Sequence, residues 1–259
     1  MNHSVAHTAT MTNKVAAITL SFWIMKICAT TLGETAGDLL SMTLNVGYAI
    51  STVILMSVFL ATLVLQLRSR HFHPALYWLV ILSTSTAGTT MSDFMDRTLG
   101  LGYAMGSAIL VSCLIVVLTV WRLTEKTLSV NAIQTTRAEV FYWVVVLFSN
   151  TLGTALGDYL ADDSGLGFLG GAMLIGSLLA GVTTLYYTTN MNRVVLFWLA
   201  FVLTRPFGAT FGDLLTKPLD GGGLGFGTIG SSAVLAVILV AMIVFSVRAH
   251  KPLGRLNAA

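Results

Sequence analysis

Eight apolar runs, each about 18 residues or longer, occupy nearly all of this 259-residue chain. They cover roughly residues 15–39, 48–67, 76–95, 103–121, 140–160, 166–188, 194–215 and 226–247. A run of that length can cross the hydrocarbon core of a bilayer as one helix. Only 10% of the residues are charged, against about 25% in soluble proteins. The sequence therefore predicts an all-α integral membrane protein, with eight transmembrane helices in a single domain.

The basic residues predict how these helices are oriented. Positive charge is retained on the cytoplasmic side of a membrane. Ten of the fourteen Lys and Arg lie before the first run or after an even-numbered one: Lys14, Arg68, Arg70, Arg122, Lys126, Arg137, Arg193, Arg248, Lys251 and Arg255. The loops after odd-numbered runs are acidic and contain only Arg97 and Lys217 as basic residues. We therefore expect a multi-pass protein with both termini in the cytoplasm. Since membrane topology accounts for the basic residues, we expect no nucleic-acid partner.

A four-fold internal repeat organises the runs in pairs. Four segments align without gaps around Asp38, Asp93, Asp158 and Asp213. Each Asp is preceded at fixed distances by a Trp (Trp23, Trp78, Trp143, Trp198) and a Gly (Gly33, Gly88, Gly153, Gly208). Because each repeat crosses the membrane twice, successive copies enter from the same side. The sequence thus predicts four parallel two-helix repeats, at about residues 15–70, 71–126, 135–193 and 194–250. The first run belongs to this repeat and lacks a small-residue cleavage site, so we interpret it as a mature helix.

The repeated positions also have a chemical interpretation. Helical spacing places hydroxyls on the face of each Asp: Thr31, Thr35, Thr86, Thr90, Thr151 and Thr210. Four such faces turned toward one centre would form a ring of carboxylates, which selects cations. An oxygen-only ligand set favours Mg²⁺, Ca²⁺ or Mn²⁺ over copper and zinc, and an organic amine fits the charge equally well. In the structural alternative, Trp anchors each helix, the glycines pack, and Asp marks a solvated turn near the outer interface.

Three ionisable residues lie within the runs: Lys26, Glu34 and Arg205. Charges inside a membrane span are usually paired or functional. Glu34 and Arg205 are expected at comparable depth in the first and last repeats, so they are the pair to compare first. Either a structural ion pair or a site that couples protons to a substrate would explain them. Pro206 follows Arg205 directly and should kink its helix, either as a packing feature or by opening a non-helical stretch beside a cavity.

Patterns typical of enzymes are absent from the sequence. Cys28 and Cys113 are isolated, and the chain has no zinc-binding cluster, phosphate-binding loop, HExxH or GxSxG motif. We therefore expect neither an enzyme nor a cofactor. An enzyme acting on lipid would need a nucleophile or a metal set that the sequence does not offer.

The chain resembles a known family in several segments. They are Phe22-Trp23-Ile24-Met25-Lys26, the stretch from Thr31 to Asp38, the stretch from Thr204 to Asp213, Glu125-Lys126-Thr127-Leu128-Ser129 and Thr135-Thr136-Arg137. These segments resemble a widespread bacterial family of uncharacterised, membrane-anchored polytopic proteins. The resemblance implies a location in the bacterial inner membrane and supplies no activity or site.

Two functions agree with these patterns. One is a secondary transporter or exporter of a small cation, either a divalent metal or an organic amine. Its transport could be coupled to the movement of protons. Glu34 and the four repeat aspartates would handle the charge. The alternative is a scaffold or stress-related membrane component that transports nothing. In both cases the lipid bilayer surrounds the protein, and a transporter would in addition bind the small cationic substrate. Eight helices suffice for a self-contained bundle, so neither function requires an oligomer.

Overall fold

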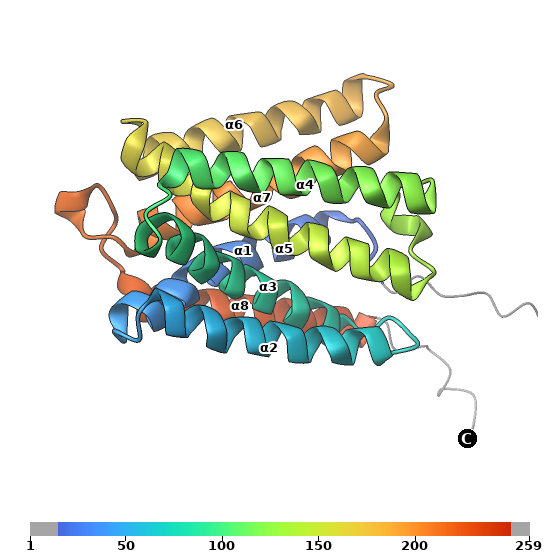
Figure 1. Cartoon of the computed structure of the whole chain (residues 1–259), viewed down its shortest axis with the longest axis horizontal. Helices are drawn as coiled ribbons and strands as arrows, with labels where there is room; N and C mark the ends of the chain where they lie inside the picture. The colour runs from blue at the N-terminus through green and yellow to red at the C-terminus, as the bar shows by residue number, and fades with distance from the viewer. Residues whose placement is uncertain (1–14, 250–259) are drawn as a thin grey trace, which may run out of the picture.

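The computed structural model describes residues 15–249, and within them all regular structure is helical. Lys14, Lys251 and Arg255, which the orientation argument uses, lie outside the described residues. Eight long helices run back and forth along the long axis of the molecule, which is horizontal in Figure 1. They are α1 (Leu20–Asp38), α2 (Tyr48–Arg68), α3 (Pro74–Asp93), α4 (Tyr103–Glu125), α5 (Thr136–Asp158), α6 (Gly167–Thr188), α7 (Arg193–Thr216) and α8 (Gly227–Ala249).

Each repeat Asp lies near the end of an odd-numbered helix, at the left-hand end in Figure 1. In the first three repeats a π-helical turn follows at once: η1 (Leu39–Thr43), η2 (Phe94–Thr98) and η4 (Tyr159–Asp163). Gly47 and Gly102 then reverse the chain with φ of 80° and 72°, values that favour glycine. The fourth repeat differs, because α7 ends without a π turn and a longer loop with the short 3₁₀ turn η5 (Leu219–Gly221) leads into α8. A second 3₁₀ turn, η3 (Val130–Ala132), joins the two halves of the chain.

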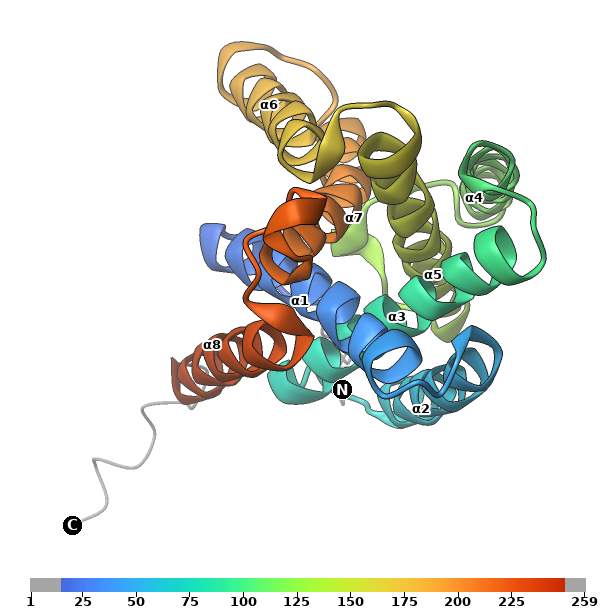
Figure 2. The same cartoon turned by 90° about the vertical axis from the view of Figure 1, so that its left-hand side faces the viewer.

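The helices form two concentric layers. Helices α1, α3, α5 and α7 make a central ring in which each contacts the next and α7 closes on α1. The outer helices each pack on the following central helix: α2 on α3, α4 on α5, α6 on α7 and α8 on α1 (Figure 2). The four two-helix units are parallel, as their spacing predicts, and they form one pseudo-four-fold ring.

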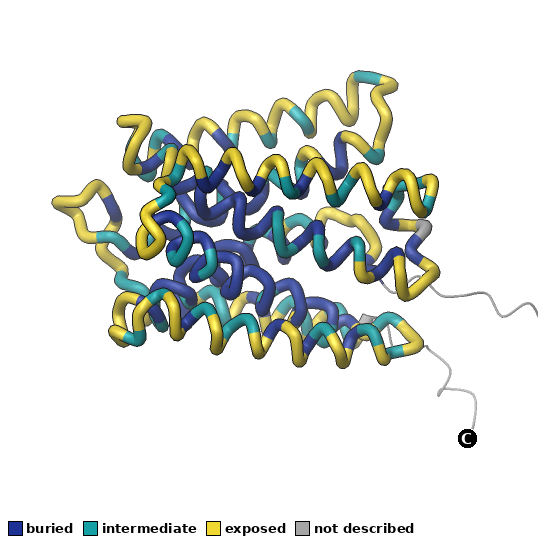
Figure 3. The backbone as a smooth tube through the Cα atoms, viewed as in Figure 1, coloured by how far each residue is buried: buried dark blue, intermediate teal, exposed yellow. Residues whose placement is uncertain are grey.

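Burial follows the two layers (Figure 3). The outer helices expose apolar side chains, such as Val53 of α2 and Phe245 of α8, whereas the central helices are mostly buried. Six helices are long and apolar enough to cross a membrane: α2, α4, α5 with η4, α6, α7 and α8. The expectation of eight such spans is thus met for six. Helices α1 and α3 are less apolar, because α1 contains the charged residues Lys26 and Glu34 and α3 contains a hydroxyl-rich stretch, Ser83–Thr86.

Glycines five residues before each Asp let the central helices pack closely. A Cβ at Gly153 would lie 2.2 Å from Arg205 Cγ, so this position admits no side chain without a shift. The same contact recurs around the ring, each glycine facing the residue eight before the next Asp: Gly33 with Ser85, Gly88 with Asn150, Gly153 with Arg205 and Gly208 with Thr30. The glycine face expected from the sequence is therefore the helix interface.

An aromatic layer closes the other end of the central ring. Each Trp is preceded by another aromatic residue, and that residue contacts the Trp of a neighbouring repeat. The ring-centroid distances are 5.6 Å for Phe22–Trp78, 5.5 Å for Tyr77–Trp143, 6.3 Å for Tyr142–Trp198 and 5.8 Å for Phe197–Trp23. Trp78, Trp143 and Trp198 are buried. Each of them packs against an aromatic residue of a neighbouring repeat, so these tryptophans contribute to the helix interfaces.

Candidate functional site

An ion pair between Glu34 and Arg205 lies at the centre of the ring. Arg205 Nη2 is 2.8 Å from Glu34 Oε2, and their side chains are 0% and 3% exposed. Two threonines from the other central helices complete the cluster. Arg205 Nη2 donates to Thr89 Oγ1 at 2.5 Å and Thr154 Oγ1 at 2.6 Å. Both hydroxyls also contact Glu34 Oε2, at 3.3 Å and 3.2 Å. All four central helices thus meet in one buried polar cluster.

The repeat explains why these side chains meet. Glu34, Thr89 and Thr154 each stand four residues before their Asp, directly after the interface glycine. The fourth equivalent position is Ala209, whose small side chain leaves the place open. The guanidinium of Arg205, which stands one turn earlier on α7, lies in the space beside Ala209. The central layer therefore holds one negative and one positive charge.

Arg205 has more hydrogen-bonding capacity than the cluster uses. A guanidinium carries five N–H donors. Its Nε and Nη1 are buried and have no hydrogen-bond partner among the described residues. Helix α7 stays helical through Pro206 and on to Thr216, so the non-helical stretch considered for this region does not form. Pro206 thus lies within a continuous helix beside an incompletely paired buried cation.

Lys26 lies in a second buried layer, nearer the aromatic end. Its Nζ donates to Asn150 Oδ1 at 3.4 Å and lies 4.2 Å from the ring centroid of Phe201. Asn150 in turn donates from Nδ2 to Thr84 Oγ1 at 2.8 Å. Lys26 does not pair with Glu34 on its own helix. Its partners come from α5 and α7, as the spacing of the two charges along α1 requires.

The four repeat aspartates are buried at the other end of the ring, between 2% and 4% exposed. This burial contradicts their interpretation as solvated turns. They also do not form a symmetric ring, because two basic residues divide them into pairs. Arg97 lies between Asp93 and Asp158, with Nε 3.1 Å from Asp93 Oδ1 and Nη2 3.0 Å from Asp158 Oδ2.

Lys217 pairs the other two aspartates. Its Nζ is 2.9 Å from Asp38 Oδ2 and 3.1 Å from Asp213 Oδ1. Burial lowers the pKa of Lys217, but the carboxylates of Asp213 and Asp38 outweigh this effect and hold the pKa above the ordinary lysine value. Burial of Arg97 is likewise outweighed by Asp93 and Asp158, which raise its pKa. Both cations are therefore firmly charged at neutral pH.

One group of carboxylates has the geometry of a cation site. Single oxygens of Glu34, Asp38 and Asp213 lie within 4.8 Å of one another, so the three could hold a metal ion. In this structure two cationic side chains serve them, Lys217 at the aspartates and Arg205 at Glu34. The arrangement links the carboxylates of Asp38 and Asp213 to the central ion pair through Glu34.

The hydroxyls chosen from the sequence are all buried, but most serve their own helices. Thr86, Thr90, Thr151 and Thr210 each donate to a carbonyl three or four residues earlier. Thr35 shares a hydrogen bond of 2.8 Å with Ser232 of α8. Thr31 Oγ1 has no hydrogen-bond partner among the described residues. None of these bonds joins a hydroxyl to a repeat carboxylate.

Several residues that line the centre of the ring were not among the predicted site residues. They are Thr84, Thr89, Asn150, Thr154 and Phe201 in the centre, and the cations Arg97 and Lys217 as partners of the aspartates. Two features of the sequence could have identified them. Thr89 and Thr154 align with Glu34 in the repeat, and Arg97 and Lys217 each stand four residues after an Asp, on the same helical face.

A comparison with known families supports the internal repeat. The family model described as a repeat of unknown function (DUF347) matches four times, at residues 21–72, 76–127, 141–192 and 196–252. These matches cover most of the chain and coincide with the four two-helix units. No curated protein and no solved structure matches the chain. By sequence and by its four repeats, the chain belongs to the DUF347 family.

Proposed function

We propose that this protein crosses the bacterial inner membrane eight times and is a secondary transporter of a small cation. The observation that carries the proposal is the column of charged side chains inside an apolar bundle. Glu34 and Arg205 occupy its centre, Lys26 lies in the next layer, and the outer layer exposes apolar residues. Charges in membrane interiors are costly and typically mark substrate or proton pathways.

Helices α1 and α3 belong among the spans in this proposal, although their composition is polar. They match the apolar helices in length and lie between them in the central ring. Their hydroxyls, such as Thr30 and Thr89, bond to neighbouring helices and to backbone carbonyls. Polar residues facing a bundle interior agree with membrane insertion. The distribution of Lys and Arg then places both termini in the cytoplasm.

Glu34 can exchange partners in this arrangement. One of its oxygens binds Arg205, and its carboxylate also lies beside Asp38 and Asp213 at the outer end. A cation that reaches the outer carboxylates would compete with Arg205 for Glu34. Protonation of Glu34 would weaken both interactions, which is the exchange that a proton-coupled transporter requires. The side chains of the central cluster are in direct contact, so this structure corresponds to a closed conformation.

Flux in proteoliposomes tests the proposal. Wild-type protein should accumulate a cation, either a divalent metal or a radiolabelled amine, when a pH gradient is imposed. Glu34→Gln and Asp38→Asn should each lower the initial rate at least tenfold. Asp220→Asn is the matched control, since Asp220 is an exposed carboxylate in the α7–α8 loop. Equal non-zero rates in all four proteins would refute the role of Glu34 and Asp38, and no flux of any of these cations would refute transport.

The close packing of the ring favours one alternative, a scaffold that transports nothing. Side chains of neighbouring helices fill the space beside the interface glycines, and the Glu34–Arg205 pair is almost fully enclosed. A scaffold would need no opening of this cluster. It predicts that a cysteine at Thr154 stays unreactive toward a water-soluble thiol reagent under every gradient. A transporter predicts labelling whose rate changes with the gradient.

A further inference from the structure

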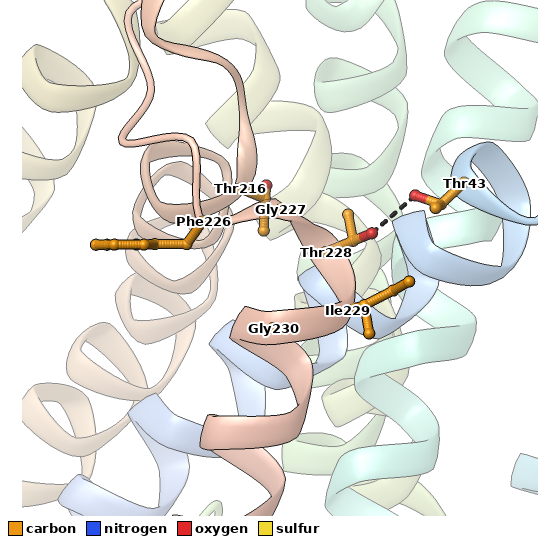
Figure 4. Close-up of a pocket in the computed structure, with 7 residues that line it drawn as sticks. All are labelled: Thr43, Thr216, Phe226, Gly227, Thr228, Ile229 and Gly230. Atoms are coloured by element: carbon orange, nitrogen blue, oxygen red, sulfur yellow. Dashed lines mark hydrogen bonds between the residues drawn. The ribbon is translucent and has the colours of Figure 1, made fainter.

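A groove opens where α8 begins, between the end of α7 and the turn that follows α1 (Figure 4). Its volume is about 340 Å³. The residues that line it are Thr43, Thr216, Phe226, Gly227, Thr228, Ile229 and Gly230. Phe226 and Ile229 are 65% and 64% exposed, and Thr43 bonds to Thr228 at 2.8 Å. The groove thus combines hydroxyls with a short apolar surface.

One buried group in the lining has no partner. Thr216 is 8% exposed, and its hydroxyl makes no hydrogen bond among the described residues. Thr216 stands three residues after Asp213, so both lie on one face of α7. The next residue is Lys217, whose ammonium lies between Asp213 and Asp38. Thr43, at the end of η1, extends the same lining from the segment that follows Asp38. The groove therefore borders the carboxylate pair that Lys217 occupies.

We propose that this groove admits a primary alkylammonium ion, whose ammonium takes the place of Lys217 between Asp38 and Asp213. The proposal rests on the proposed function and names its substrate class. The alkyl chain lies along Ile229, and the Thr216 hydroxyl accepts a hydrogen bond from the ligand. Lys217 swings toward solvent, as its position in the loop after α7 permits.

The distances favour an ammonium over a metal ion. Lys217 Nζ donates a hydrogen bond of 2.9 Å to Asp38 Oδ2 and lies 3.1 Å from Asp213 Oδ1 in an ion pair, distances typical of an ammonium beside carboxylates. Mg²⁺ and Ca²⁺ need oxygens at about 2.0–2.6 Å, so the carboxylates would have to close in. A lysine side chain is itself an ammonium on a four-carbon stem, so n-butylammonium is its free equivalent. The site already holds the headgroup that we assign to the ligand.

The second carboxylate pair provides a control within the same chain. Arg97 between Asp93 and Asp158 has its guanidinium carbon 5.9 Å and 5.5 Å from the ring centroids of Tyr48 and Tyr103. A planar guanidinium under aromatic rings is a different headgroup site from an ammonium beside an apolar groove. Butylammonium should therefore replace Lys217 but not Arg97.

Chemical rescue of full-length protein in detergent tests the proposal. Lys217→Ala should lower the unfolding temperature, and n-butylammonium should restore it saturably. Tetramethylammonium, which has no N–H donor, should not. Butylammonium should bind about tenfold to sixtyfold more tightly than methylammonium, because each buried CH₂ strengthens binding up to about fourfold. Ile229→Ala in the same background should reduce this chain-length gain. Arg97→Ala should show no butylammonium rescue.

Three results would overturn the proposal. They are no saturable effect of butylammonium on Lys217→Ala or on the milder Lys217→Gln, an equal effect of tetramethylammonium, and rescue that persists when Asp38→Asn is added. Because the readout is binding, its failure is separable from that of transport. Amine flux that depends on Glu34 without butylammonium binding would refute only this site. Binding without flux would refute only the transporter.

Discussion

The Glu34–Arg205 pair offers the sharpest test of the central cluster. Glu34→Gln keeps the side-chain shape and removes the negative charge, so the buried guanidinium of Arg205 loses its counter-ion at 2.8 Å. Removing one partner of a buried ion pair typically costs about 3–5 kcal/mol, since the other charge stays desolvated. We expect a loss of that size in the free energy of unfolding. Reversible unfolding in mixed micelles, followed by tryptophan fluorescence, measures it.

The double variant decides whether the two charges act as a pair. Arg205→Met alone should be as damaging as Glu34→Gln, because it leaves a buried carboxylate without its cation. Combining them removes both charges, so the double variant should be more stable than their separate costs predict by about 1–3 kcal/mol. Asp220→Asn, on the surface, should change stability by less than about 0.5 kcal/mol. If the costs of the two substitutions are strictly additive, Glu34 and Arg205 do not stabilise the protein as a pair.

Two further changes test the helix interface and the outer cluster. Gly88→Ala would place a Cβ 3.0 Å from a backbone nitrogen of α5, so it should cost about 1–3 kcal/mol of unfolding free energy. Gly181→Ala on α6, which meets nothing within 4 Å, should be neutral or stabilising, and equal effects of the two would contradict the packing argument. Lys217→Met removes an ammonium whose pKa is raised in the folded protein. The stability that this ammonium contributes should be constant below about pH 10.4, its unfolded pKa, and decline as the pH rises further. The free energies of unfolding of wild type and variant at about pH 7, 9 and 11 give this contribution. If their difference grows with pH, the ammonium of Lys217 is not the stabilising group.

Much of the framework was predictable because the repeat records it four times. The apolar runs match the eight helices to within a few residues at most ends. The interface glycines stand five residues before each Asp, and they mark where neighbouring helices meet. Comparable depth in the first and last repeats also identified Glu34 and Arg205 as partners. These features depend on spacing along single helices, which a sequence contains directly.

The face that each helix turns to the centre was not predictable in the same way. Thr90 stands three residues and Thr89 four residues before Asp93, so helical spacing allows either to share its face, but only Thr89 contacts the ion pair. The choice depends on how neighbouring helices seat against the glycines, which is a property of the assembled ring. The pairing of Asp158 with Arg97 likewise crosses between repeats. Contacts of that kind become visible only when the order of helices around the ring is known.

The framework of the ring is symmetric, whereas the charged side chains inside it are not. Four copies of a charged residue in the central layer would bring like charges into contact, and one Glu with one Arg avoids this repulsion. Both charges lie at the interface of α1 and α7, where the last repeat closes on the first. Asp38, Asp213 and Lys217 lie at the end of that same interface that is opposite the aromatic layer. The insertion in the α7–α8 loop and the groove also occur there. Arg97 with Asp93 and Asp158 forms a similar cluster between α3 and α5, but the central ion pair, the loop insertion and the groove all occur at the α1–α7 interface. The packing of the repeats alone gives no physical reason for that coincidence. This concentration favours a single pathway along α1 and α7 over a central pore shared equally by four repeats.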